Sequence, residues 1–205
     1  MSPLLFPTLD LPEKEVGLIT EVYHTLKPGH PDAAFDFDFQ PQLSNFESIT
    51  GYYTDNRLGP ALRLDTASPH KYLCFLNLTY RGLQGKYTSG VYTEYQTWGV
   101  SFLKGDYGHI LIRPETTLDK IRELLHHAEL DFEDDKAFSS RFYVLANDEG
   151  KARILLGPAV RQKMLDLQLK DFMLEIIDNM MIIGDNKCID PATAGEIASF
   201  LYKLS

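Results

Sequence analysis

The sequence has little cysteine, little positive charge and no long apolar run, and each shortage argues against a class of protein. Only two cysteines occur among the 205 residues. Cys74 and Cys188 lie far apart, with no CxxC pair and no histidine at the spacing of a metal site. We therefore expect two reduced thiols rather than a disulfide, as is usual in the cytosol.

Basic residues are outnumbered, since 20 Lys and Arg face 29 Asp and Glu, for a net charge of −9 at pH 7. Proteins that bind nucleic acid neutralise phosphates with a surface of Lys and Arg. Adhesion to an anionic membrane surface needs the same charge. The composition argues against both classes and leaves a basic protein partner open.

The longest apolar runs, such as residues 180–183, are far shorter than the ~20 residues that a membrane span needs. Residues 1–6 have neither the basic start nor the long apolar stretch of a signal peptide. From these two shortages we expect a soluble, cytoplasmic protein.

Apolar residues recur at helical spacing near the start and then give way to a long β-rich stretch. The spacing over residues 12–26 predicts a helix that ends at Lys27, Pro28 and Gly29. Candidate strands punctuated by turn residues follow, and their direct succession predicts antiparallel pairing. These strands cover residues 48–53, 61–64, 72–80, 90–95 and 109–112.

The second half predicts a smaller unit of strand, helix, helix, hairpin and helix. The fold class is therefore α+β, with a mainly antiparallel sheet and an N-terminal helix. We expect a helix plus β-rich region over 1–130 and an α+β unit over 131–205 packed on it, or a single domain. The elements expected after the β-rich stretch are a helix over 118–128, a strand over 141–146, a short helix capped by Asn147-Asp148, a helix from Pro158, a hairpin of 172–177 and 180–183 with a turn at Asp178-Asn179, and a helix from Asp190-Pro191.

One tract of the second half is similar to a known family. Residues 138–160 contain Arg-Phe-x-Val, from Arg141 to Val144, and then Ala-Arg-x-Leu-Leu-x-Pro-Ala, from Ala152 to Ala159. Over about 136–185 the chain resembles the end of a family of uncharacterised bacterial proteins, a domain of unknown function. The resemblance implies a bacterial origin and a fold, but no mechanism. Members of that family often carry membrane spans near their start, and this sequence shows none.

Two aspartates form a candidate metal site. The run Phe35-Asp36-Phe37-Asp38-Phe39 alternates, so a strand would place the phenylalanines on one face and Asp36 and Asp38 on the other. Two such carboxylates can hold a hard divalent cation when further oxygen ligands join them. The sequence identifies no further ligand, and a buried Phe face with a solvent-facing Asp face explains the same alternation.

Aromatic residues of the β-rich region form a candidate binding surface. Tyr92 and Glu94 would share one face of a strand, while Val91, Thr93 and Tyr95 share the other. Aromatic rings on an open sheet face suit a protein partner or a sugar ring, and they are also common in packed sheets. The candidate residues are Tyr80, Tyr87, Tyr92, Tyr95 and Trp98.

Other motifs do not reach the pattern of a catalytic site. Adjacent helical residues such as His126 and His127 point about 100° apart, which does not suit one shared metal ion. The loop from Gly82 to Lys86 lacks the spacing of a phosphate-binding loop. Cys188 has no identifiable histidine partner. The sequence therefore predicts no catalytic residue and no cofactor.

These observations favour a non-enzymatic bacterial binding or interaction protein with a protein partner. An enzyme with an unrecognised site is one alternative. Within the binding class, an immunity-type protein that neutralises a basic toxin fits the size and charge. A structural subunit of a larger assembly, which would form a homo-oligomer, is the remaining alternative.

Overall fold

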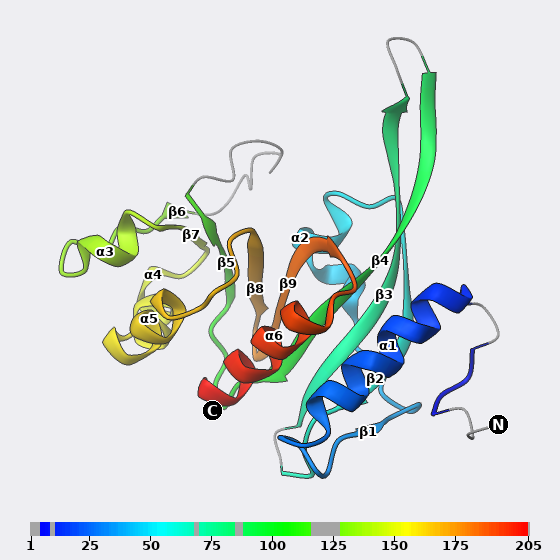
Figure 1. The fold of residues 1–205 in the computed structure, drawn as a ribbon. Helices are drawn as coiled ribbons and strands as arrows, with labels where there is room; N and C mark the ends of the chain where they lie inside the picture. Colours follow the sequence, from blue (N-terminus) through cyan, green and yellow to red (C-terminus); the bar gives the residue numbers. More distant parts are fainter. Residues whose placement is uncertain (1–4, 9–10, 68–69, 85–87, 116–127, 205) are drawn as a thin grey trace.

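The structure, a computed structural model, describes residues 5–8, 11–67, 70–84, 88–115 and 128–204. These residues form one twisted sheet with the strand order β1-β2-β3-β4-β9-β8-β5-β7-β6 (Figure 1). Neighbouring strands pair antiparallel throughout. Together with the helices, this is the predicted α+β fold with a mainly antiparallel sheet.

The elements have the following bounds. The strands are β1 (Ala34–Phe35), β2 (Asp55–Arg63), β3 (Lys71–Gln84), β4 (Thr88–Phe102), β5 (His109–Pro114), β6 (Ala128–Glu129), β7 (Phe142–Ala146), β8 (Phe172–Ile177) and β9 (Met180–Cys188). The helices are α1 (Glu13–Leu26), the 3-10 helix η1 (Leu43–Asn45), α2 (Glu47–Thr50), α3 (Lys136–Ser139), α4 (Glu149–Leu155), α5 (Pro158–Leu165) and α6 (Pro191–Lys203). Within the described ranges, no helix is long and apolar enough to cross a membrane.

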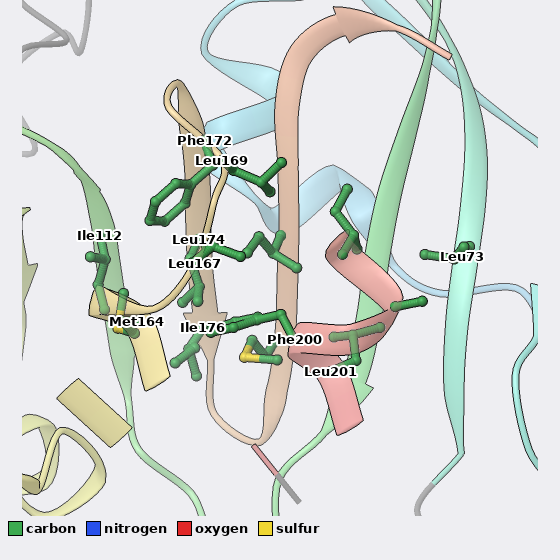
Figure 2. Close-up of a cluster of buried hydrophobic side chains, with 14 of the residues drawn as sticks. Leu73, Ile112, Met164, Leu167, Leu169, Phe172, Leu174, Ile176, Phe200 and Leu201 are labelled. Atoms are coloured by element: carbon green, nitrogen blue, oxygen red, sulfur yellow. The ribbon is translucent and has the colours of Figure 1, made fainter. Parts of the chain in front are cut away.

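Buried hydrophobic side chains form two clusters, one on each face of the sheet. The neighbours Leu73 and Cys74 belong to different clusters because strand side chains alternate between the faces. The larger cluster includes side chains of α1, α5 and α6. Figure 2 shows Phe200 and Leu201 of α6 in this cluster, together with Ile176 of β8. The smaller cluster is covered by η1 and α2.

Elements with strong local signals lie where the sequence predicts them. Helix α1 ends at Leu26, and the hairpin of β8 and β9 turns at Asp178 and Asn179. Helix α4 begins after Asp148, whose side chain accepts a hydrogen bond from the Lys151 amide. Helix α6 has the same type of cap, with Asp190 and the Thr193 amide. Of the helix predicted over 118–128, residues 118–127 lie outside the described residues, and Ala128 belongs to β6.

Two predicted strands are wrong. Residues 48–53 contain α2 and a turn rather than a strand. The strand predicted over 35–39 ends at Phe35 because the Asp36 carboxylate accepts a hydrogen bond from the Asp38 amide, which turns the chain locally. Phe37 is consequently 56% exposed instead of sharing a buried face with its neighbours.

Strands β3 and β4 extend well beyond the rest of the sheet as a two-stranded ribbon (Figure 1). Strand β2 pairs with β3 as far as Thr79, and β9 pairs with β4 as far as Gln96. Past these points the pairing of β3 with β4 continues to Gln84 and Thr88. The ribbon therefore stands beside no third strand of the described chain.

Candidate functional site: a tyrosine-lined groove at the base of the ribbon

A groove of about 460 Å³ lies where the ribbon leaves the sheet, beside the turn that follows α2. Residues from four parts of the chain meet there: the turn after α2, β3, β4 and β9. We call this the tyrosine groove, and its lining residues are Gly51, Tyr52, Tyr53, Tyr80, Arg81, Glu94 and Asn186.

The tyrosine rings stand at large angles to one another. The ring centroids of Tyr53 and Tyr80 are 6.2 Å apart with an interplanar angle of 78°. Those of Tyr52 and Tyr53 are 6.5 Å apart at 51°. Tyr92, farther along the ribbon, stacks on Tyr80 at 5.5 Å and 23°. The aromatic surface thus continues from the groove onto the ribbon.

Gln96, whose side chain is fully buried, connects the groove to the core. The Trp98 indole N–H donates to Oε1 of Gln96 over 3.1 Å. Nε2 of Gln96 donates to the Tyr53 hydroxyl over 2.7 Å and to Oε2 of Glu94 over 3.2 Å. Because an indole only donates, the oxygen of Gln96 has to face Trp98, and this fixes the direction of both other bonds.

A second hydrogen bond holds the Glu94 carboxylate from the opposite strand. The Tyr80 hydroxyl donates to Oε1 of Glu94 over 2.8 Å. This bond, with burial, raises the pKa of Tyr80 above its usual value. Burial raises the pKa of Tyr53 to about 12. Both phenols are therefore neutral at physiological pH and keep their protons for hydrogen bonding.

The aromatic residues singled out in the sequence are divided between the two faces of the sheet. Tyr80 and Tyr92 lie on the groove side. Trp98 is fully buried beneath it, against the backbone of Gly184, where an added Cβ would lie 2.4 Å from the indole Cδ2. Tyr95 lies on the opposite face, where its hydroxyl accepts from Asn77. Tyr87 lies outside the described residues.

Sequence reasoning missed most of this site, including Tyr52, Tyr53 and the buried Gln96. The sequence predicts Tyr52 and Tyr53 in a strand over 48–53, whereas the structure places them in the turn after α2. A signal for Gln96 was present, because one further step of the alternation from Tyr92 and Glu94 reaches it on the same strand face.

The aspartates of the predicted metal site lie in the turn after β1. Asp36 Oδ2 accepts from the Tyr72 hydroxyl over 3.3 Å and lies 3.7 Å from Nη1 of Arg63. Asp38 is exposed and does not share a strand face with Asp36. Searched over its described parts, the chain has no group of three or more His, Cys, Asp or Glu placed to hold a metal ion.

A buried carboxylate on β8 contacts α2, which covers the same face of the sheet. Glu175 is fully buried, and its two oxygens accept from the amides of Glu47 and Ser48 over 3.0 and 2.7 Å. Nε2 of His109 lies 2.6 Å from Oε1 of the same carboxylate. Since the carboxylate holds the first turn of α2, the pair positions the chain that leads to Tyr52 and Tyr53.

The remaining candidates do not join this site. His126 and His127 lie outside the described residues. Cys74 is buried and Cys188 is exposed, and both thiols are free. Burial raises the pKa of the Cys74 thiol, which keeps it protonated and unreactive.

Comparisons with known proteins do not identify a family. No family model matches the chain. No curated protein matches it either. Among solved structures, the chain is similar to the crystal structure of the mycobacterial trehalose monomycolate transport factor A, TtfA. The TM-score is 0.47 and the identity 10%, over 91% of this chain and 92% of that chain. A likeness at this level carries no argument about function.

Proposed function

We propose that this protein is a non-enzymatic binding protein that contacts a protein partner through the tyrosine groove. The observation that carries this proposal is the way the groove is built: Tyr53, Tyr80 and Glu94 are held at its surface by hydrogen bonds that converge on Gln96 and Trp98. A surface of this kind is ordered before any partner arrives.

Tyrosine suits such a surface for physical reasons. It supplies a large, rigid ring at a low cost in conformational entropy, and its hydroxyl still forms hydrogen bonds. Tyrosines are accordingly enriched among the interface residues whose truncation costs about 2 kcal/mol or more of binding free energy. The acidic net charge of −9 favours association with a basic partner.

The experiment is native mass spectrometry of the protein purified gently from its own host. We expect a second protein at stoichiometric mass with the wild-type chain. Tyr52→Ser and Tyr80→Ser each remove a ring from the groove, and each should weaken this complex by about 30-fold or more if the tyrosine is such an interface residue.

The matched control is Tyr107→Phe, which alters a tyrosine that packs against the α1 and α6 side of the sheet. This variant should retain the partner fully. A partner retained equally by both groove variants would place the interface elsewhere. Wild-type protein that carries only a stoichiometric small molecule would favour an enzyme instead.

A further inference from the structure

The Glu94 carboxylate in the tyrosine groove can accept more hydrogen bonds than the described part of the chain donates to it. An ionised carboxylate offers about four lone-pair sites for hydrogen bonds. Among the described residues, two groups donate to Glu94, namely the Tyr80 hydroxyl and the Gln96 amide. The carboxylate is thus fixed in position by its neighbours and can accept further hydrogen bonds from a molecule in the groove.

The rings beside this carboxylate add a second attraction for positive charge. The face of a tyrosine ring carries partial negative charge and attracts cations within about 6 Å of its centroid. Rings from Tyr52, Tyr53 and Tyr80 line the groove, at angles of 51° and 78° between neighbours, so they present different faces and edges to it.

One positive residue also lines the groove. Arg81 is exposed and follows Tyr80 directly in β3, so its side chain starts from the opposite face of the ribbon. It lies opposite Val91, which belongs to that same face. Because Arg81 starts from the opposite face and only borders the groove, a cation that enters meets Glu94 and the rings first. The like charge of Arg81 at the border opposes its approach, so removal of that charge should strengthen binding.

We infer that the tyrosine groove receives an arginine side chain of a basic protein partner, with its guanidinium against the rings and donating to Glu94. This inference rests on the proposed function. A guanidinium suits the site better than an ammonium because it is planar, stacks on aromatic rings and donates two parallel hydrogen bonds to one carboxylate. An anionic group would be repelled by Glu94 and by the net charge of −9.

The test uses the peptide acetyl-Gly-Arg-Gly-amide as a probe, titrated into the full chain while the NMR signals of the tyrosine rings are followed. We expect saturable shifts of the Tyr52, Tyr53 and Tyr80 signals with a Kd of about 1–10 mM, the range of a single side chain. Glu94→Gln should weaken binding about 10-fold or more, because the charge-assisted bonds are lost. Arg81→Gln should strengthen binding.

Two controls separate lost recognition from lost structure. Tyr52→Leu removes a ring that takes no part in the hydrogen bonds around Gln96. It should weaken binding of the peptide, while the NMR signals of the other tyrosine rings in the peptide-free protein stay unchanged. Glu133→Gln, at an exposed acid elsewhere, should leave the Kd unaltered.

Three results would overturn the inference. They are the absence of saturation with the wild-type chain, an unchanged Kd in Glu94→Gln, and tighter binding of the neutral sugar maltose to the same rings. The proposed function would still stand under any of these results if binding of a host protein is weakened by Tyr52→Ser and Tyr80→Ser. Loss of that dependence would remove the proposed function itself.

Discussion

Gln96 pairs its side-chain oxygen and both of its amide hydrogens in one place. Its oxygen accepts from Trp98, and its amide group donates to Tyr53 and Glu94. A buried amide whose oxygen and nitrogen are both hydrogen-bonded costs the fold little, whereas loss of any partner leaves a buried polar group unpaired. The chemistry of the groove therefore depends on a residue that does not line it.

We predict that Gln96→Leu lowers the free energy of unfolding by about 1–3 kcal/mol, because the buried Trp98 N–H loses its acceptor. Urea denaturation measures this change, with the fluorescence of Trp98, the single tryptophan of the chain, as the signal. Gln162→Leu, on the exposed side of α5, is the control and should stay within about 0.5 kcal/mol of wild type. Equal stability of both variants would mean that the Gln96 network contributes nothing to the fold.

Because Asp185 on β9 is a buried acid, we predict that the free energy of unfolding depends on pH. Burial raises the pKa of this carboxyl above its usual value, with Lys187 opposing the shift. Between the usual pKa and the raised one, the folded state binds more protons than the unfolded state. The free energy of unfolding therefore falls as pH rises through this window and stays lowered above it.

Asp185→Asn removes this ionisation. The variant should be more stable than wild type at pH 7, and its advantage should shrink toward zero below about pH 3.9, where the aspartate is protonated in both states. Thermal denaturation at several pH values measures the difference. A variant that is less stable at pH 7 would show that the contacts with Lys187 outweigh the cost of burial.

At the scale of elements, the sequence predicts what short-range signals determine. The sequence predicts the starts of α4 and α6 because Asp148 and Asp190 each accept a hydrogen bond from the amide three residues later. The hairpin turn is visible for a similar reason, since Asp178 has a φ of 55°, a conformation that Asp adopts more readily than most residues.

Helix α2 could not be predicted in this way. Its first amides donate to Glu175, which lies 128 residues after Glu47 in the sequence. A contact of such separation leaves no local pattern, and the tertiary structure overrides the strand preference of residues 48–53. The same contact determines where Tyr52 and Tyr53 lie, so their place in the groove was hidden as well.

We predict that Glu175→Gln lowers the free energy of unfolding by about 2–4 kcal/mol. The amide group of glutamine donates where two backbone amides and His109 need an acceptor, so buried donors lose their partners. Chemical denaturation gives the magnitude, and NMR signals of Glu47 and Ser48 should shift. Glu133→Gln has no such buried contact and should change stability by less than about 0.5 kcal/mol. A small effect at Glu175 would mean that α2 holds its place without the carboxylate.

At the scale of the molecule, the sequence predicts strands and helices but not their order in space. Strands β4 and β9 lie side by side although the hairpin of β8 and β9 comes late in the chain. That pairing brings Asn186 to the groove, and strands from both sides of residue 130 share one sheet. The division into two units stays a prediction. Tyr80 and Tyr92 lie on strands whose alternation is clear in the sequence, and their role in binding stays a prediction.

Some strands of the sheet have a neighbour on both sides and others do not, so we predict that their amides differ in protection from hydrogen exchange. Strands β4, β9 and β8 each have a neighbour on both sides and contribute to the buried clusters. The ribbon past Thr79 has two strands only, and a two-stranded hairpin in water is marginally stable. In hydrogen exchange we expect the central amides to open with the global free energy, and those of β3 past Thr79 to open at least about 2 kcal/mol more easily.

The concentration dependence of this protection decides between a monomer and an assembly. Weak protection of the ribbon at every concentration means that both of its edges face solvent, as a binding protein awaiting a partner requires. Protection that rises with concentration means that a second copy covers the ribbon, and it would favour a structural subunit. Native mass spectrometry of the same samples should then show a homo-oligomer. Val91 is 69% exposed on the ribbon, so Val91→Lys should disrupt the contact between the copies. A different result would contradict the prediction: strong amide protection of the ribbon in a monomer, with the same protection in Val91→Lys. The ribbon would then be stable by itself, and its amides would not open more easily than those of the central strands.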